Sequence, residues 1–225
     1  LQAYTSVLEV PGEVDLAIIV VNAKFVLSTI DQCHEKGIKG LCIITAGFKE
    51  TGKEGAEVEK QLVEKIKEYG MRCVGPNCLG VVNTHPDVRM DGCFAESLPE
   101  RGNIGFVSQS GALGGGILNI LKDLNLGFAQ FISIGNQADV NAETALEYWE
   151  NDEDVKQILL YMESIQDPAN FRKLATRITK KKPILALKSG RSAAGASAAS
   201  SHTGSLAGAD KAAAALLHQS GIIRE

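Results

Sequence analysis

The sequence lacks long apolar runs, C-x-x-C pairs and an excess of basic residues. Its longest apolar runs, such as Leu16 to Val21, have the length of a strand and are too short to cross a membrane. No signal peptide is visible at the start. An odd number of cysteines without C-x-x-C spacing predicts neither a zinc site nor a disulfide framework, so we expect no metal site and a reducing, cytoplasmic location.

The charge balance argues against nucleic acid as a partner. The chain carries 23 Lys and Arg against 27 Asp and Glu, a net charge of −4, whereas binding to a phosphate backbone requires a basic face. With 225 residues, 44% hydrophobic and 22% charged, the composition is typical of a soluble globular protein of one large or two ordinary domains. Because the sequence begins at Leu1 without methionine, we expect a segment upstream to be missing.

Strand and helix patterns alternate along the chain in two blocks. In the first block, strands are predicted at 16–21, 41–45 and 71–74, with helices at 24–36 and 54–69. In the second block, strands are predicted at 104–107, 128–132, 157–161 and 184–187, and helices at 111–122, 141–150, 168–180 and 206–220. This order predicts an α/β fold of two doubly wound parallel-sheet units.

A stretch without periodicity separates the two blocks. Residues 83 to 102 are rich in turn formers such as Pro86, Gly92 and Pro99. We therefore predict two domains, residues 1–92 and residues 93–225.

Small and polar residues follow four of the predicted strands. In open parallel sheets, ligands bind at the carboxyl ends of strands, and glycine allows a ligand to approach the backbone closely. The four segments are Thr45-Ala46-Gly47, Gly75-Pro76-Asn77-Cys78-Leu79-Gly80, Ser108-Gln109-Ser110-Gly111 and Ser133-Ile134-Gly135-Asn136.

The segment Ser108 to Gly111 is the most informative of the four. It follows a strand and opens a helix, so its free amides and the positive end of the helix dipole would face an anion such as phosphate. Ordinary capping by serine is the alternative, and position alone does not separate the two. The spacing argues against a nucleophile elbow, because Ser110 is flanked by Ser108 and Ala112 rather than by glycines.

Two further residues could carry chemistry. His202 lies in a loop of small residues, where an accessible imidazole could act as a nucleophile and carry a phosphoryl group. Glu163 follows the strand predicted at 157–161, where a carboxylate could orient a histidine, although a solvated loop acid is the simpler interpretation.

These segments together resemble a known superfamily, the acyl-CoA synthetases that form a nucleoside diphosphate. It includes the α subunit of succinyl-CoA synthetase and the ADP-forming acetyl-CoA synthetases. The resemblance spans essentially the whole chain, and Ser201 to Gly208 is most similar to the ADP-forming acetyl-CoA branch. It implies a partial Rossmann-like CoA-binding domain followed by a flavodoxin-like CoA-ligase domain.

The resemblance also implies roles for single residues. His202 would be the phosphorylated histidine and Glu163 the residue that orients it. The phosphate would be held by Ser108, Ser110, Gly111, Gly135 and Asn136. Coenzyme A would be held by Ile44, Thr45, Ala46, Gly75, Pro76 and Asn77.

The implied reaction interconverts acyl-CoA, ADP and phosphate with a carboxylic acid, CoA and ATP. ATP or ADP with Mg²⁺ would bind an ATP-grasp domain that this chain lacks, so we expect an ATP-grasp β subunit or fused domain as partner, within a hetero- or homo-oligomer. Gly115 stands where the succinyl-CoA enzymes carry a tyrosine, which argues against succinate as the acid.

Two other functions are weighed against the synthetase. One is a non-catalytic CoA-binding module of an acetyltransferase-fused relative, which the presence of His202 and Glu163 disfavours. The other is a dinucleotide-dependent oxidoreductase, which requires a G-x-G-x-x-G fingerprint that the sequence does not contain.

Overall fold

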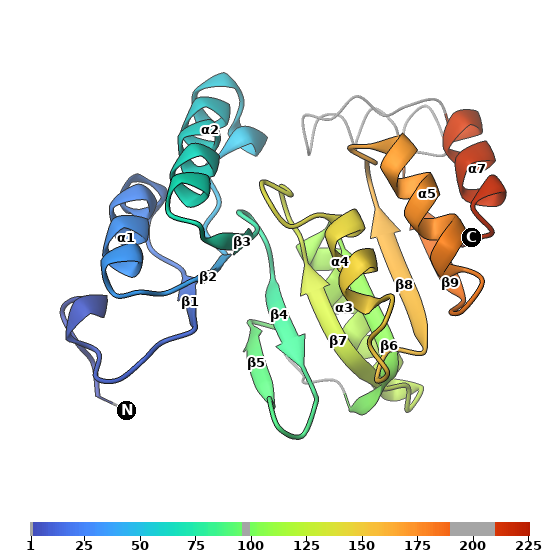
Figure 1. The fold of residues 1–225 in the computed structure, drawn as a ribbon, viewed down its shortest axis with the longest axis horizontal. Coiled ribbons are helices and arrows are strands. Elements are labelled where there is room, and N and C mark those ends of the chain that lie inside the picture. Colours follow the sequence, from blue (N-terminus) through green and yellow to red (C-terminus); the bar gives the residue numbers. More distant parts are fainter. Residues whose placement is uncertain (1, 96–99, 190–209) are drawn as a thin grey trace.

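The chain forms two β-sheets flanked by helices, as seen in a computed structural model that describes residues 2–95, 100–189 and 210–225 (Figure 1). The first sheet lies in the N-terminal third of the chain and the second in the remainder. None of the helices in these ranges is long and apolar enough to span a membrane.

The first sheet has three parallel strands in the order β1-β2-β3. Its strands are β1 (Leu16–Ile19), β2 (Gly40–Ile43) and β3 (Arg72–Val74), linked by α1 (Ala23–Glu35) and α2 (Lys53–Glu68), with short 3₁₀ turns η1 (Val7–Glu9) and η2 (Lys49–Thr51). Because the strand order does not reverse, right-handed crossovers put both helices on one face of the sheet.

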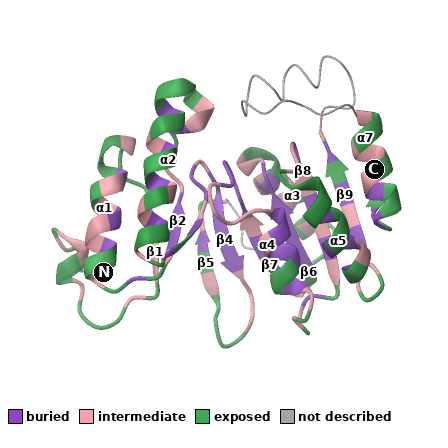
Figure 2. Cartoon of the chain, turned by 45° about the horizontal axis from the view of Figure 1, so that its top comes forward, coloured by how far each residue is buried: buried purple, intermediate pink, exposed green. Residues whose placement is uncertain are grey.

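Helix α1 shows why the sequence forms these elements. The Asn22 side chain caps its first turn by accepting from the Lys24 amide at 3.3 Å. Its buried residues Val26, Ile30 and Cys33 recur at helical spacing and face the sheet. Figure 2 shows the same division on α1 and α2, with buried residues toward the sheet and exposed residues outward.

The second sheet has seven strands in the order β10-β9-β8-β6-β7-β4-β5. They are β4 (Gly80–Asn83), β5 (Met90–Cys93), β6 (Arg101–Ser108), β7 (Phe128–Ser133), β8 (Gln157–Met162), β9 (Ile184–Lys188) and β10 (Ile223–Arg224). The helices are α3 (Gly111–Asp123), α4 (Ala142–Trp149), α5 (Pro168–Ile178) and α7 (Asp210–Gln219). β4 runs antiparallel to β7 and β5, and the other pairs are parallel.

Strand β6 is the point at which the winding of this sheet reverses. The chain moves from β6 to β7 on one side and then returns to β8 on the other side. The loops after these three strands therefore diverge and leave a crevice, which is the usual ligand position in doubly wound sheets.

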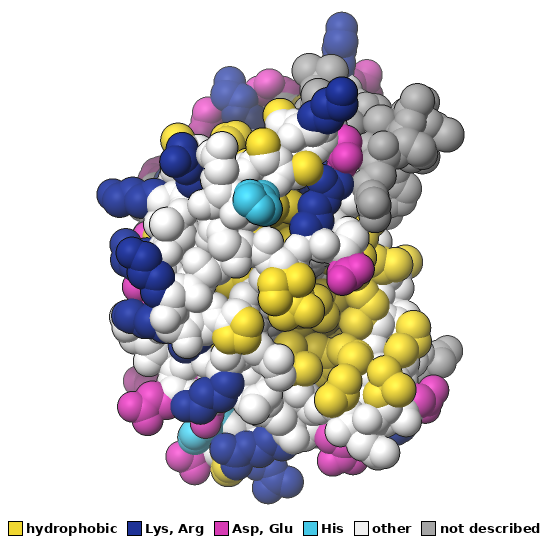
Figure 3. Space-filling model, turned by 90° about the vertical axis from the view of Figure 1, so that its right-hand side faces the viewer, with side chains coloured by type: hydrophobic (Ala, Val, Ile, Leu, Met, Phe, Trp, Pro, Cys, Tyr) yellow, Lys and Arg dark blue, Asp and Glu magenta, His cyan; other side chains and the backbone are white. Residues whose placement is uncertain are grey.

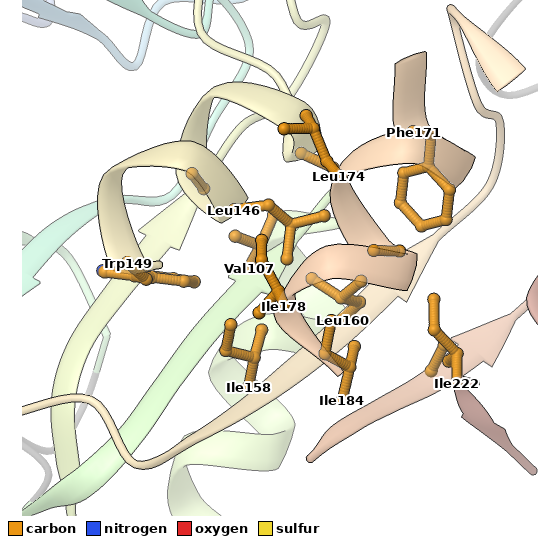
Figure 4. Packing of buried hydrophobic residues seen from close by; sticks show 14 of the residues in the cluster. Val107, Leu146, Trp149, Ile158, Leu160, Phe171, Leu174, Ile178, Ile184 and Ile222 are labelled. Atoms are coloured by element: carbon orange, nitrogen blue, oxygen red, sulfur yellow. The ribbon is translucent and has the colours of Figure 1, made fainter. Parts of the chain in front are cut away.

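The largest core lies between this sheet and helices α4 and α5 (Figure 4). Trp149 is fully buried there, and its indole Nε1 donates to Gln130 Oε1 at 2.9 Å. Phe171, Leu146 and Leu160 are also buried, and each such side chain contributes about 1.5–3 kcal/mol to folding.

The opposite face of the sheet is covered by α3 alone among the described helices. Strand alternation places Leu187 on that face and, through the pairing of Ile223 with Leu185, Ile223 as well; both are exposed. Ile120 and Leu124 of α3 are exposed too. Figure 3 shows a broad patch of hydrophobic side chains on the side of the molecule that carries β9 and α7.

The structure confirms the predicted α/β class, and each predicted strand and helix has a counterpart within a few residues, α7 beginning at Asp210. The hairpin β4–β5 was not predicted. It pairs with β7, so the chain passes from the first sheet to the second between Val74 and Gly80. The domain boundary at residue 92 stays a prediction. The hairpin lacks an alternating apolar pattern, because Met90-Asp91-Gly92-Cys93 mixes polar and small residues.

Candidate active site

The turn after β6 brings Ser108, Ser110 and the start of α3 together. Ser110 caps α3, its Oγ accepting from the Leu113 amide at 3.3 Å, and Ser108 Oγ donates to the Ser110 carbonyl at 2.6 Å. A Cβ added at Gly114 would lie 3.0 Å from the Phe131 ring, so the glycine allows α3 to pack tightly on the sheet. The positive end of the α3 dipole thus meets the crevice.

The turn after β7 packs directly on the segment predicted to bind CoA. Gly135 has a φ of +51°, and an added Cβ would lie 2.3 Å from the Pro76 carbonyl oxygen, which leaves no room for a side chain. The Asn136 amide donates to that same carbonyl at 2.9 Å, and Asn77 Nδ2 donates to Asn136 Oδ1 at 3.3 Å. The turn predicted to bind phosphate and the segment predicted to bind CoA are therefore in direct contact.

Asn136 also binds two acidic residues of the N-terminal unit. Its Nδ2 donates to Glu50 Oε2 at 2.6 Å and to Glu59 Oε2 at 2.8 Å. Lys49 pairs with Glu59 at 3.0 Å and its Nζ donates to the Asn136 carbonyl. Burial alone would raise the pKa of Glu50, but hydrogen bonds from Asn136, Gly47 and Phe48 outweigh it and hold that pKa below its usual value.

The segment after β2 lies beside the Gly75-Pro76-Asn77 turn. The Asn77 amide donates to the Thr45 carbonyl at 3.0 Å. The Thr45 hydroxyl donates to the Val21 carbonyl at 2.7 Å, so it stabilises the end of β1. Gly75, with a φ of +96° and a cis peptide bond to Pro76, would place a Cβ 2.4 Å from the Ile43 carbonyl oxygen.

Glu163 follows β8 and is 6% exposed. Its backbone amide donates to Gln109 Oε1 at 2.8 Å, and the Ser164 amide donates to the same oxygen at 3.1 Å. Gln109 Nε2 donates in turn to Ser164 Oγ at 3.2 Å. Gln109, from the turn after β6, therefore holds the peptide that carries Glu163.

A cavity of about 460 Å³ joins these elements. It is lined by Ile44, Ala46, Asn77, Cys78, Leu79, Phe94, Gln109, Ser110, Gly111, Ala112, Gly135, Asn136 and Glu163. Eight of these residues were predicted from the sequence. Four other predicted residues do not line the cavity, but their backbone groups bond to residues that do or to their neighbours: Thr45, Gly75, Pro76 and Ser108. His202 lies outside the described residues.

Sequence reasoning singled out no role for the other lining residues, Cys78, Leu79, Phe94, Gln109 and Ala112. Cys78, Leu79 and Gln109 stand inside segments that were noted for following strands, so their position was a usable signal. Phe94 comes from the hairpin that the pattern did not reveal. Within residues 2–95, 100–189 and 210–225, no group of three His, Cys, Asp or Glu side chains converges to hold a metal.

Cys78 is the one thiol in the cavity lining that the structure describes. Its Sγ lies 3.8 Å from that of Cys42 and donates to the Ile43 carbonyl at 3.3 Å. The hydrogen bond with Cys42 and burial raise the pKa of the Cys78 thiol. Cys78 is therefore held in its thiol form and is a poor nucleophile at neutral pH.

The fold and the cavity define a doubly wound α/β protein with a cavity at the carboxyl ends of β6, β7 and β8. The chain belongs to the family of the succinyl-CoA ligase like flavodoxin domain, whose model matches residues 101–225. A CoA binding domain model matches residues 1–84.

Similar proteins cover the whole chain. It is 51% identical over 222 residues to the α subunit of acetate–CoA ligase [ADP-forming] II of Pyrococcus furiosus, which covers 99% of this chain and 48% of that protein. It is 46% identical to acetate–CoA ligase [ADP-forming] of Methanocaldococcus jannaschii, covering 100% of this chain and 31% of that one. The chain thus spans about half or less of the length of these relatives.

A solved structure shows the same arrangement. It is the dinucleotide forming acetyl-coenzyme A synthetase 1 of Ca. Korarchaeum cryptofilum, in complex with phosphate and ADP. Its TM-score is 0.94 at 37% identity, and the match covers 100% of this chain and 48% of that one.

Proposed function

We propose that this chain is the CoA-binding and flavodoxin-like part of an ADP-forming acyl-CoA synthetase that acts on acetate or another small carboxylic acid. The observation that supports the proposal is the shared cavity. It is lined both by the segment around Asn77 that is predicted to bind CoA (the CoA segment) and by the turn around Ser110 that is predicted to bind phosphate (the phosphate turn). A reaction in which phosphate displaces CoA from a thioester requires both ligands to reach one carbonyl carbon.

The first chemical step would take place in this cavity. A phosphate oxygen attacks the thioester carbonyl carbon, the carbon–sulfur bond breaks and CoA leaves as the thiolate, giving an acyl phosphate. The amino-terminal end of α3, with Ser110 and Gly111, would hold the phosphate, because free amides and a helix dipole stabilise an anion. Ile44, Ala46 and Asn77 would contact CoA from the other end of the cavity.

The second step transfers the phosphoryl group to His202. An imidazole nitrogen attacks phosphorus, the bond to the acyl oxygen breaks and the carboxylate leaves. Glu163, which faces the cavity from the end of β8, would accept a hydrogen bond from the other ring nitrogen and fix the tautomer. ADP, bound with Mg²⁺ in an ATP-grasp subunit or fused domain, would then accept the phosphoryl group.

The partner and the location belong to the same proposal. Relatives whose names contain "subunit alpha" imply a second subunit in those enzymes, and we propose an ATP-grasp partner within a hetero- or homo-oligomer here. The cysteines are all free in the structure, and a cytoplasmic location would keep them reduced and supply CoA and ATP.

The experiment that tests the proposal is labelling of the complete protein, with its ATP-grasp part, by ATP that carries a radioactive γ-phosphate, in the presence of Mg²⁺. We expect protein-bound label that is acid-labile and base-stable and that disappears in His202→Ala. A folded complex that binds CoA and takes up no label would contradict the synthetase and favour a CoA-binding module.

A further inference from the structure

One wall of the cavity has no ligand assigned to it. Leu79, Phe94 and Ala112 line the cavity together with the CoA segment and the phosphate turn. We infer that these three residues, called here the acyl wall, contact the acyl group and select an acid that carries no second charge. The inference rests on the proposed function, because it assigns the third group of the same reaction.

The chemistry requires a third subsite. Three groups meet at the thioester carbonyl carbon during the first step, namely the CoA sulfur, the attacking phosphate oxygen and the substituent of the acid. The first two are accounted for by Asn77 and its neighbours and by the amino-terminal end of α3. Apart from the buried Cys78, the acyl wall is the apolar part of the lining that remains, and an apolar surface favours an apolar substituent.

The fold holds the acyl wall in place through Leu79. The Leu79 amide donates to Ser133 Oγ at 2.9 Å, and the Phe94 amide donates to the Leu79 carbonyl at 3.3 Å. An added Cβ at Gly111 or at Gly115 would lie 3.4 Å from the Leu79 side chain, an ordinary van der Waals distance, so Leu79 lies against the first turns of α3.

Phe94 provides surface that a ligand can cover. Leu79 is 6% exposed, whereas Phe94 is 65% exposed although its side chain is large and apolar. Contact with the substituent of an acid would remove part of the Phe94 ring from water, which favours binding in proportion to the area covered.

The charges of the described lining residues disfavour a second carboxylate. Among the lining residues that the structure describes, Glu163 is the one with a formal charge, and none is Lys, Arg or His. A dicarboxylic acid would bring a second carboxylate into a lining in which no described cation can pair with it, and an unpaired charge in a cavity is disfavoured.

The experiment compares acids in the complete enzyme with its ATP-grasp part. ADP release from ATP is measured with acetate, 3-methylbutanoate and succinate, each with CoA and Mg²⁺. The variants are Phe94→Ala, which removes the ring, and Phe94→Arg, which adds a cation. Tyr148→Ala is the matched control, because Tyr148 is 61% exposed on α4 and is not among the residues that line the cavity.

For the wild type we expect kcat/KM for succinate to be at least about 100-fold below that for acetate. In Phe94→Ala the ratio of 3-methylbutanoate to acetate should fall by about tenfold, since an apolar contact is lost. In Phe94→Arg the ratio of succinate to acetate should rise by about tenfold. The KM for CoA should not change, and Tyr148→Ala should leave all ratios unchanged.

Two results would contradict the proposed role of the acyl wall. One is efficient use of succinate by the wild type, and the other is a set of acid ratios that neither Phe94 variant changes. Labelling of the protein by ATP without acid or CoA separates the two proposals. Label with unchanged ratios overturns the acyl wall alone, whereas a wild type without label and without ADP release overturns the proposed function and the acyl wall with it.

Discussion

Glu163 and Gln109 form a unit in which one side chain fixes the backbone of the other. Gln109 Oε1 accepts from two successive amides, those of Glu163 and Ser164. Both side chains come from the ends of neighbouring strands, β6 and β8, and both face the cavity. The position of the Glu163 carboxylate therefore depends on a residue 54 positions earlier in the chain.

We expect Glu163→Gln to slow phosphorylation of His202 by roughly 100-fold, because a neutral amide cannot stabilise the imidazole as a nucleophile. The rate is measured by labelling the complete enzyme with radioactive ATP. Glu147→Gln is the control, since Glu147 is exposed on α4. Equal rates in the wild type and Glu163→Gln would mean that Glu163 does not orient His202 and has a structural role only.

We expect Gln109→Met to slow the same labelling by about tenfold, because the Glu163 carboxylate is no longer held in one place. The loss of the shared acceptor should also lower the free energy of unfolding by about 2 kcal/mol. Gln157→Met is the matched control, since Gln157 donates to Asn103 on the exposed surface. Labelling that stays at the wild-type rate despite the lost stability would contradict a positioning role.

At the scale of elements, the Gly135–Asn136 turn joins the two sheets. Asn136 contacts Pro76 and Asn77 of the CoA segment and the carboxylates of Glu50 and Glu59. The Asn136 side chain, predicted to bind phosphate, uses its amide hydrogens on these carboxylates. Phosphate binding by Asn136 stays a prediction, in which the backbone of the turn would take part.

Glu50 makes the stability of this contact between the two sheets depend on pH. A carboxyl whose pKa is lower in the folded than in the unfolded state stabilises the fold above its ordinary value of 4.5, and this stabilisation is lost as pH falls. We expect the free energy of unfolding of the wild type to fall below about pH 4.5 and to fall less in Glu50→Gln. Denaturant titrations at several pH values measure both curves.

Glu57→Gln is the control for that titration, because Glu57 is exposed on the neighbouring helix α2. Its curve should follow that of the wild type. Parallel curves for the wild type and Glu50→Gln would mean that Glu50 has the same pKa in the folded and unfolded states.

The elements that the sequence predicted share a simple pattern. Strands β1, β2, β6 and β8 are apolar runs, and α1 and α2 repeat apolar residues at helical spacing, so burial on a sheet can be read from the residues themselves. Strand β5 of the hairpin, with Asp91 and Gly92 at its centre, and the two-residue β10 have no such pattern. The hairpin and β10 form strands because β7 and β9 offer them edges to pair with, which is a long-range effect.

At the scale of the whole molecule, exposed apolar side chains gather on and beside α3 among the residues that the structure describes. Ile120 and Leu124 are 59% and 61% exposed, and the α3 side of β9 and β10 adds Leu187 and Ile223. Large contiguous apolar patches on a protein surface mark contacts with other protein surfaces or a tendency to associate.

We expect the 225-residue chain by itself to bind an apolar dye and to self-associate as its concentration rises. The double change Ile120→Lys and Leu124→Lys should reduce both effects without loss of helix, because lysine is a good helix former. Dye fluorescence, sedimentation velocity and circular dichroism measure the three properties. Identical dye binding in the wild type and the double variant would mean that the dye binds to another apolar surface.

The sequence by itself determined the α/β class, the order of the main elements and the small, polar turns that follow the strands, because these depend on local apolar spacing and on glycine, serine and asparagine after strands. Only the tertiary structure decided that the turns around Asn77, Ser110 and Gly135 line one cavity. It also decided that Gln109 holds Glu163 and that Phe94 faces the same space. These relations join residues far apart in the chain, and they follow from the reversal of winding at β6 and from the pairing of the hairpin with β7.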